Sequence, residues 1–100
     1  MLEKSDFYNQ VTIDIFDGKK SKKVLKTLPD NLWSIAYRKL TFLNRAYKLE
    51  HLRISPNNRL EKLSGNRQGQ HSIRINDQCR ICFIWDKNKP THIEIADYHR

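Results

Sequence analysis

Five cations and a closing histidine stand among apolar residues in the second half of the chain. A small sheet has few structural uses for so many cations, so we expect a positively charged surface that binds a phosphate chain. The sequence Asp97-Tyr98-His99 adds an imidazole, the side chain that exchanges protons near neutral pH. The cations are Arg59, Lys62, Arg67, Arg74 and Arg80.

The chemistry that these residue types favour is the cleavage of RNA. RNA carries its own nucleophile, the 2′-hydroxyl beside each phosphodiester. A protein can cleave it without a metal by aligning that hydroxyl, neutralising the phosphoryl oxygens and protonating the leaving 5′-oxygen. Arginine and lysine serve the neutralisation, and histidine serves the proton transfer. We therefore expect no cofactor, and we expect DNA to be left intact because it lacks the hydroxyl.

Each candidate also has a structural explanation. Arg80 lies within an apolar strand, where it either pairs with a carboxylate such as Asp97 or Glu94 or faces a site. Arg59 and Lys62 lie where a strand edge would leave them as surface charges.

Three further candidates are also open to a structural explanation. Arg74 shares a strand face with Asn76, and solvation explains it better than a site. Tyr98 stacks on a base or closes the core. His99 taken alone is a weak signal, because it lies beside the C-terminus.

The charge balance supports an anionic partner. The formal net charge is +8, of which residues 1–30 carry +1 (six Lys/Arg against five acids) and residues 31–100 carry +7 (thirteen against six). Nucleic acid, an anionic membrane or an acidic protein segment would suit this excess. The alternative is a basic surface that binds nothing in particular.

The densest basic run, from Lys19 to Lys26, has two interpretations. We expect a solvated connector. The other interpretation is a second contact with RNA phosphates, through Lys22 and Lys23, or with an acidic partner.

The two cysteines, Cys79 and Cys82, have a spacing that occurs in zinc and redox sites. Residues three apart on a strand point to opposite faces of the sheet, and no second pair of ligands is present in the sequence. We therefore predict two buried thiols and no metal.

The apolar pattern predicts an α+β fold. Residues 1–6 are a weak strand, and residues 7–16 favour a helix, although Val11, Ile13 and Ile15 also alternate as in a strand. A long amphipathic helix runs from Leu28 to Tyr47. Its buried stripe consists of Leu32, Ile35, Ala36, Leu40, Leu43, Ala46 and Tyr47, and Arg38, Lys39, Asn44 and Arg45 lie off it.

Strands are predicted at residues 59–63, 71–76, 79–85 and 91–98, with a tight turn at Asn76-Asp77. We expect two N-terminal helices on one face of a mainly antiparallel sheet of four to five strands. The other face would be open, and Arg80 would look out from it.

The length of 100 residues indicates a single domain, residues 1–100. No apolar run approaches the roughly 20 residues that span a membrane, and the first residues lack an apolar signal core. We therefore expect a cytoplasmic protein without a membrane partner.

Several stretches carry a resemblance to a known family. They are residues 52–56 (Leu-Arg-Ile-Ser-Pro), 58–65 (Asn-Arg-Leu-Glu-Lys-Leu-Ser-Gly), 69–78, 80–85 and the closing residues 94–99 (Glu-Ile-Ala-Asp-Tyr-His). Together they resemble the HigB/GraT-type toxins of the RelE superfamily, which belong to type II toxin–antitoxin systems.

The resemblance implies a small RelE-like fold and cleavage of messenger RNA within codons in the A site of the 30S ribosomal subunit, beside 16S rRNA. It implies a helix-turn-helix antitoxin (HigA-like) as the partner, with operator DNA bound only through the complex. The matching positions imply a catalytic set of Arg59, Lys62, Arg80, Asp97, Tyr98 and His99.

In these roles Arg80 and Lys62 stabilise the pentavalent phosphate, and His99 is the general acid. Asp97 orients His99 or helps to hold Arg80, Arg59 positions the phosphate, and Tyr98 stacks on or aligns the nucleotide. We predict further RNA contacts at Arg67, Arg74, Asn76, Lys22 and Lys23.

The chain departs from the family at three positions. Cys79 stands where the family often has Trp, and Arg100 follows a motif that often ends at the histidine. The residue at Arg59 varies among members.

Two rival hypotheses remain. One is a basic RNA- or ribosome-binding module without chemistry, and the other is a gyrase-poisoning relative on the same fold.

Overall fold

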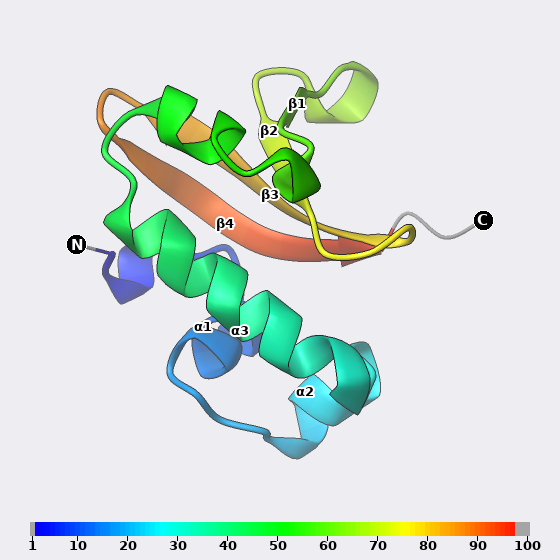
Figure 1. Ribbon diagram of the computed structural model, residues 1–100. Helices are drawn as coiled ribbons and strands as arrows, with labels where there is room; N and C mark the ends of the chain where they lie inside the picture. Colours follow the sequence, from blue (N-terminus) through cyan, green and yellow to red (C-terminus); the bar gives the residue numbers. More distant parts are fainter. Residues whose placement is uncertain (1, 98–100) are drawn as a thin grey trace.

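The computed structural model describes residues 2–97 as helices packed on one face of a four-stranded sheet (Figure 1). The strands are β1 (Glu61–Lys62), β2 (His71–Arg74), β3 (Cys79–Asp86) and β4 (Lys89–Asp97). They lie in chain order, and each is antiparallel to the next. The predicted α+β class and mainly antiparallel sheet are confirmed.

The pairing register divides the side chains of the sheet between two faces. Ser72 pairs with Cys82, Arg74 with Arg80, and Cys82 with Glu94. Because paired residues lie on the same face of a sheet, these side chains share one face, which we call the arginine face. The alternate residues of β3 face the helices, and we call that side the helical face.

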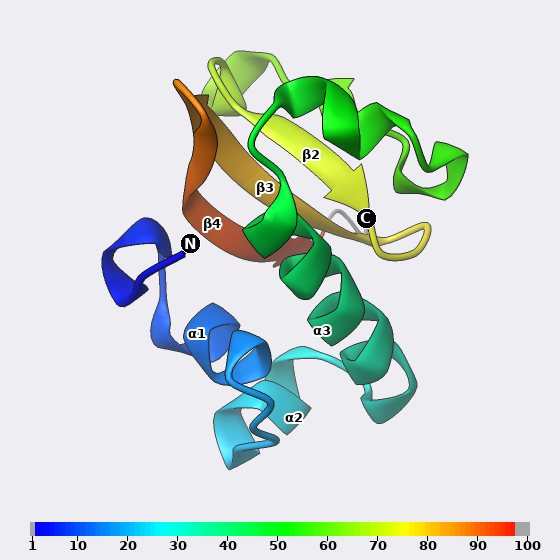
Figure 2. The same ribbon diagram turned by 60° about the vertical axis from the view of Figure 1, so that its left-hand side comes forward.

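Three α-helices are present in residues 2–97: α1 (Gln10–Phe16), α2 (Lys22–Thr27) and α3 (Asp30–Arg45). Figures 1 and 2 both place α1, α2 and α3 on one side of the sheet, with α2 farthest from β2. Four short 3-10 helices complete the fold: η1 (Lys4–Asp6), η2 (Leu49–Arg53), η3 (Pro56–Asn58) and η4 (Gly65–Arg67).

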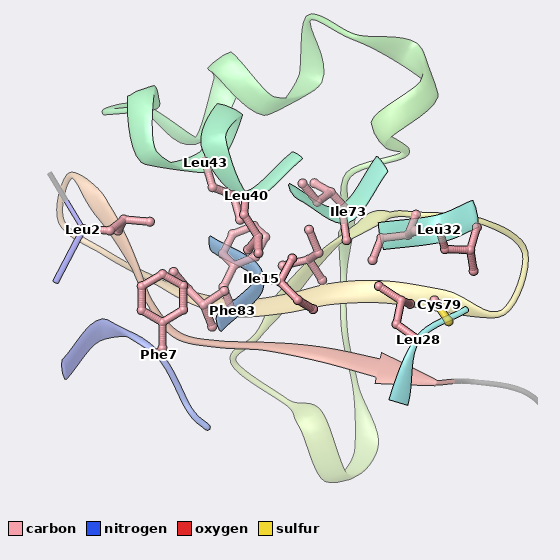
Figure 3. Packing of buried hydrophobic residues seen from close by; sticks show 14 of the residues in the cluster. Leu2, Phe7, Ile15, Leu28, Leu32, Leu40, Leu43, Ile73, Cys79 and Phe83 are labelled. Carbon is pink, nitrogen blue, oxygen red and sulfur yellow. The ribbon is translucent and has the colours of Figure 1, made fainter. Parts of the chain in front are cut away.

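The hydrophobic core lies between α3, α1 and the helical face of the sheet (Figure 3). Leu40 and Leu43 of α3 meet Ile73, Phe83 and Ile15 there, and all five are fully buried. Each such side chain contributes about 1.5–3 kcal/mol by leaving water, so this layer holds the sheet rigid behind the arginine face.

The N-terminal segment differs from its prediction. Residues 1–6 were expected to form a strand, but Lys4–Asp6 form η1. Phe7 was expected to be helical, yet it makes a parallel bridge with Ile93 of β4. Helix α1 begins only at Gln10, because the side chain of Asn9 accepts the backbone N–H of Thr12 and caps it.

The basic run was predicted to be a connector, but it forms α2. Ser21 accepts the backbone N–H of Val24 and caps the helix. Val24 and Leu28 are fully buried and hold it against the core, whereas Lys22, Lys23 and Lys26 are exposed. The structure therefore has three α-helices where two were predicted.

Helix α3 confirms the predicted long helix, with two differences. It ends at Arg45, and Tyr47 is 63% exposed although it was placed in the buried stripe. Lys39 was placed off the stripe but is only 9% exposed. Its ammonium reaches backbone carbonyls that lie far away in the sequence, which the helical pattern alone does not reveal.

No helix within residues 2–97 is long and apolar enough to cross a membrane.

Candidate active site

Arg80 is held at the centre of the arginine face by neutral acceptors. Its Nε donates to Ser72 Oγ at 2.6 Å, and its Nη2 donates to the carbonyl of Arg59 at 2.6 Å. The carbonyl of Ser72 accepts a longer bond from Nη2, at 3.4 Å. Because these acceptors carry no net charge, they orient the guanidinium without cancelling its charge.

Arg80 also lies near one carboxylate, that of Glu61. Its Oε1 lies 3.7 Å from Arg80 Nη2, and its side chain is 57% exposed. An exposed pair at this distance contributes little stability. Of the two carboxylates that we considered for Arg80, Glu94 pairs with Arg67 instead, and the pairing with Asp97 stays a prediction.

The arginine face is covered at its centre, whereas we expected it to be open. Arg80 is 9% exposed, and Ser72 and Cys82 are fully buried. The segment between Arg59 and Gln70 covers this face as a loop. Arg67 of this loop forms an ion pair with Glu94, whose Oε1 lies 2.9 Å from Arg67 Nη1. Arg67 also donates to Gln70 Oε1 at 3.1 Å, so it fastens the covering loop to β4.

Arg59 contributes to the site through its backbone. It follows η3 in the left-handed conformation, with φ of 45°, and this turn directs its carbonyl to Arg80. Its side chain is exposed and lies near enough to Asp77 to lower the pKa of that carboxyl, after the larger effect of Arg74. The predicted role of the Arg59 side chain stays a prediction.

Lys62 lies on the other face of the sheet. Glu61 pairs with Ser72 and shares the arginine face, whereas Lys62 pairs with His71, which in turn pairs with Phe83. The register therefore does not bring Lys62 together with Arg80, although Lys62 is exposed on the edge strand. Burial, and then the charges of Lys62 and Arg53, lower the pKa of His71.

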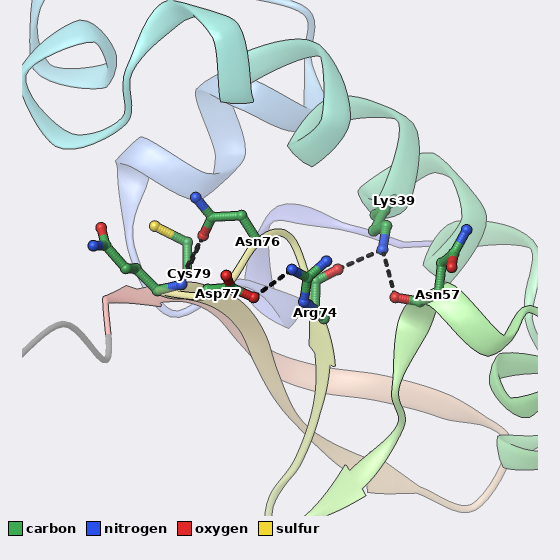
Figure 4. Close-up of polar contacts among 7 residues, drawn as sticks. Lys39, Asn57, Arg74, Asn76, Asp77 and Cys79 are labelled. Carbon is green, nitrogen blue, oxygen red and sulfur yellow. Dashed lines mark hydrogen bonds and ion pairs between the residues drawn. The ribbon is translucent and has the colours of Figure 1, made fainter.

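Arg74 and Asn76 build the hairpin that joins β2 to β3 (Figure 4). Arg74 forms an ion pair with Asp77 at 2.6 Å. The Asn76 side chain accepts the backbone N–H of Gln78 at 2.9 Å and that of Cys79 at 2.7 Å. These contacts give both residues a structural role beside their predicted contact with RNA.

Lys22 and Lys23 lie on α2, on the side of the sheet that faces away from Arg80 (Figures 1 and 2). The structure does not bring them together with the other predicted residues.

The end of β4 lies beside Arg80. Ala96 pairs with Arg80, and Asp97 pairs with Cys79 and is exposed. Tyr98 and His99, the remaining members of the predicted set, fall outside the described residues.

Both cysteines are buried, as predicted. Burial, and then the charge of Asp97, raise the pKa of Cys79, which makes its thiolate harder to form. Within residues 2–97 no group of three His, Cys, Asp or Glu side chains is arranged to hold a metal ion.

Sequence reasoning missed Ser72 and Glu61, the side chains that contact Arg80. The predicted turn at Asn76-Asp77 sets the register of the hairpin and places Ser72 diagonally across from Arg80. That register was the available signal. The carbonyl of Arg59 had no such signal, because it comes from outside the hairpin.

The class of protein with this small antiparallel sheet and helices on one face is that of the RelE-like toxins. The family profile described as "RelE-like toxin of type II toxin-antitoxin system HigB" matches residues 6–99. The chain therefore belongs to the HigB-like toxins of type II toxin–antitoxin systems.

Two relatives match part of the chain. The chain is 42% identical over 60 residues to Toxin HigB-1 of Vibrio cholerae serotype O1, covering 60% of this chain and 63% of that protein. It is 30% identical over 66 residues to an uncharacterized protein of Haemophilus influenzae, covering 66% and 65%. These matches thus span slightly less than two thirds of either relative.

A solved structure extends the likeness over nearly the whole fold. It is the YoeB–YefM complex from Staphylococcus aureus, with a TM-score of 0.54 and 25% identity, covering 94% of this chain and 93% of that one.

Proposed function

We propose that this chain is a toxin that cleaves messenger RNA in the ribosomal A site, without a metal, and that an antitoxin neutralises it. Its family supports the toxin class. The single observation that carries the chemistry is the guanidinium of Arg80, which is fixed by Ser72 Oγ and the Arg59 carbonyl while its positive charge stays available.

Arg80 would stabilise the charge that develops on the phosphoryl oxygens. A donor fixed before the reaction needs no reorganisation when that charge appears, and a site of low exposure strengthens the interaction. Arginine suits this task because its planar fork matches two phosphoryl oxygens. The part of the side chain that remains accessible, 11%, is the part a phosphate would contact.

The proton donor would be His99. Two residues of chain span at most about 7 Å, which keeps the Cα of His99 within that distance of the Cα of Asp97. Asp97 is the neighbour in sequence of Ala96, the residue paired with Arg80. The proposal requires the imidazole to reach the phosphate that Arg80 contacts, and this short connection to β4 supports His99 as the candidate.

In the proposed reaction the 2′-hydroxyl gives up its proton to solvent water as its oxygen attacks phosphorus, and the bond from phosphorus to the 5′-oxygen breaks. His99 gives its proton to that 5′-oxygen, so the products are a 2′,3′-cyclic phosphate and a 5′-hydroxyl. Asp97 would orient His99, Tyr98 would align the nucleotide, and Arg59 would position the phosphate. Lys62 would have to reach round the sheet edge to join them.

The proposed partners are the 30S subunit with its 16S rRNA, the message, and a helix-turn-helix antitoxin of the HigA type. Operator DNA would be bound only through the toxin–antitoxin complex. The structure similar to this fold is itself a complex, YoeB–YefM, which supports the expectation of an antitoxin.

Brief induction in growing cells, followed by primer extension, tests the proposal. We expect cuts within translated codons that disappear in Arg80→Ala and in His99→Ala. The matched control is Lys48→Ala, which removes an exposed cation before η2 and should leave the cuts in place.

Three other outcomes would contradict the proposal. Equal cutting of naked RNA would remove the need for the ribosome. Growth arrest with DNA damage and intact messages would favour a gyrase poison. Ribosome binding that does not depend on His99, with no cutting, would favour a binding module.

A further inference from the structure

A groove of about 690 Å³ lies outside the candidate active site, between α3 and the segment that contains η3. One wall is the side of α3 that faces away from the core, with Tyr37, Arg38, Phe42 and Arg45. The other wall is the stretch from Ser55 to Asn58. The volume falls within the range of ligand-binding clefts, and the proposed chemistry makes no use of it.

The charge of the groove selects an anionic occupant. Three of its lining residues are cations (Arg38, Lys39 and Arg45), and none of them is acidic. Arg38 and Arg45 are exposed and stand seven residues apart on one helix, which is about 10 Å along its axis. Carboxylates spaced over two turns of a helix or along a short strand would match them.

Lys39 lines the groove, and its ammonium contacts two backbone carbonyls (Figure 4). Its Nζ donates to the carbonyl of Arg74 at 2.5 Å and to the carbonyl of Asn57 at 3.4 Å. Burial, and then the charges of Arg38, Arg74 and Arg80, lower the pKa of Lys39. A carboxylate that entered the groove would relieve this crowding of like charges.

The aromatic residues favour a peptide over RNA. Tyr37 is stacked on Trp33, with ring centroids 5.4 Å apart and planes at 3°, so one face of its ring is covered. Phe42 is half-buried and packs against the core. Apolar side chains can lie against the remaining ring surface, whereas bases need open ring faces on which to stack.

The second wall of the groove is continuous with the support of Arg80. The buried side chain of Asn58 donates to the carbonyl of Leu52 at 3.2 Å and fixes η3. Arg59, the next residue, presents its carbonyl to Arg80. An occupant that presses on Asn57 therefore acts on the segment that positions the guanidinium, as an inhibitor would.

We propose that this groove docks an acidic segment of the antitoxin, anchored by an apolar side chain. The inference rests on the proposed function, because it takes the partner to be the antitoxin of this toxin. The groove then binds the partner through charge and shape at a distance from the catalytic groups. The occupant touches Asn57 and Asn58, which precede Arg59, and not the accessible edge of Arg80.

Binding of the purified cognate antitoxin to toxin variants tests this docking site. In Arg38→Glu/Arg45→Glu we expect the affinity to fall at least about tenfold, with a weaker dependence on salt, because charge pairs across an interface are reversed. The control Lys4→Glu/Lys87→Glu makes the same change of charge at two exposed lysines that do not line the groove, and it should bind within about threefold of the wild type.

A second variant tests shape without changing charge. Thr41→Trp would fill the groove from α3, since Thr41 lines it and is partly exposed. It should weaken antitoxin binding to a similar degree, while its thermal unfolding shows that the domain still folds. Wild-type affinity in both groove variants would overturn the docking site.

Message cutting by the same variants separates this inference from the proposed function. Normal antitoxin binding with lost RNA binding in Arg38→Glu/Arg45→Glu would assign the groove to RNA and overturn the inference. A wild-type chain that binds the antitoxin but cuts no message would refute the proposed function. The affinities of the groove variants would still decide the docking site.

Discussion

Ser72→Ala tests whether the hydroxyl of Ser72 holds Arg80. The hydroxyl is fully buried and accepts Arg80 Nε at 2.6 Å. Removing it leaves a buried cationic N–H with a weaker partner, the Ser72 carbonyl, which Arg80 reaches only through Nη2. A hydrogen bond to a charged group contributes about 1.5–3 kcal/mol, so the free energy of unfolding should fall by about that amount.

Urea denaturation followed by the fluorescence of Trp33 and Trp85 measures this change. For a domain of this length the loss corresponds to a fall in the melting temperature of roughly 6–24 °C. The control Ser64→Ala makes the same chemical change at an exposed serine whose side chain caps nothing. Its stability should stay within about 0.5 kcal/mol of the wild type.

Message cutting should fall together with stability in Ser72→Ala, assayed at a temperature at which the variant is folded. If the unfolding free energy of Ser72→Ala matched that of Ser64→Ala, the hydroxyl would not be holding the guanidinium. The account of a fixed Arg80 would then have to be abandoned.

Three further predictions concern the rest of the fold. A double-mutant cycle on Arg67 and Glu94 should give a coupling of about 1 kcal/mol, against about 0–0.5 for the exposed pair Lys20–Asp30; equal couplings would show that Arg67 does not fasten the loop. Because burial lowers the pKa of His71, the unfolded chain binds its proton more readily, so stability should fall as pH drops from 7.5 through the usual histidine range near about 6.5. His71→Phe should flatten that dependence, and an unchanged slope would contradict the assignment. Both buried cysteines should react slowly with a thiol reagent in the folded protein, whereas fast labelling in native buffer would place one of them at the surface.

The hairpin of β2 and β3 could be predicted from the sequence because its signals are local. Alternation around Ile73, the apolar run from Cys79 and the turn at Asn76-Asp77 each act over a few residues. The structure has the same elements, with Ile73 on the helical face and Arg80 on the other.

Lys39 shows where such patterns fail. The helical pattern assigned it to the polar face, and long-range partners determine its true place. It donates to carbonyls that are 18 and 35 residues away in the sequence, and these contacts exist only in the folded chain. The bridge between Phe7 and Ile93 is also a contact between residues far apart in the sequence. Because of it, Phe7 is not part of the helix that was predicted there.

The candidate site could be predicted in part. Sequence reasoning selected Arg80, and the structure adds the neutral groups that hold it, Ser72 and the carbonyl of Arg59. It also placed Lys62 beside Arg80, whereas the register puts Lys62 on the opposite face. Strand β1 has only two residues. It is too short for an alternating pattern to predict which face of the sheet each side chain occupies.

The most direct test of the central claim is single-turnover cutting of a message on purified ribosomes by Arg80→Lys. Lysine keeps the charge but cannot bind Ser72 Oγ and the Arg59 carbonyl while presenting a second donor to the phosphate. We predict a rate at least about 100-fold below the wild type, close to that of Arg80→Ala. A rate for Arg80→Lys within about threefold of the wild type would contradict the claim that the fixed guanidinium performs this chemistry.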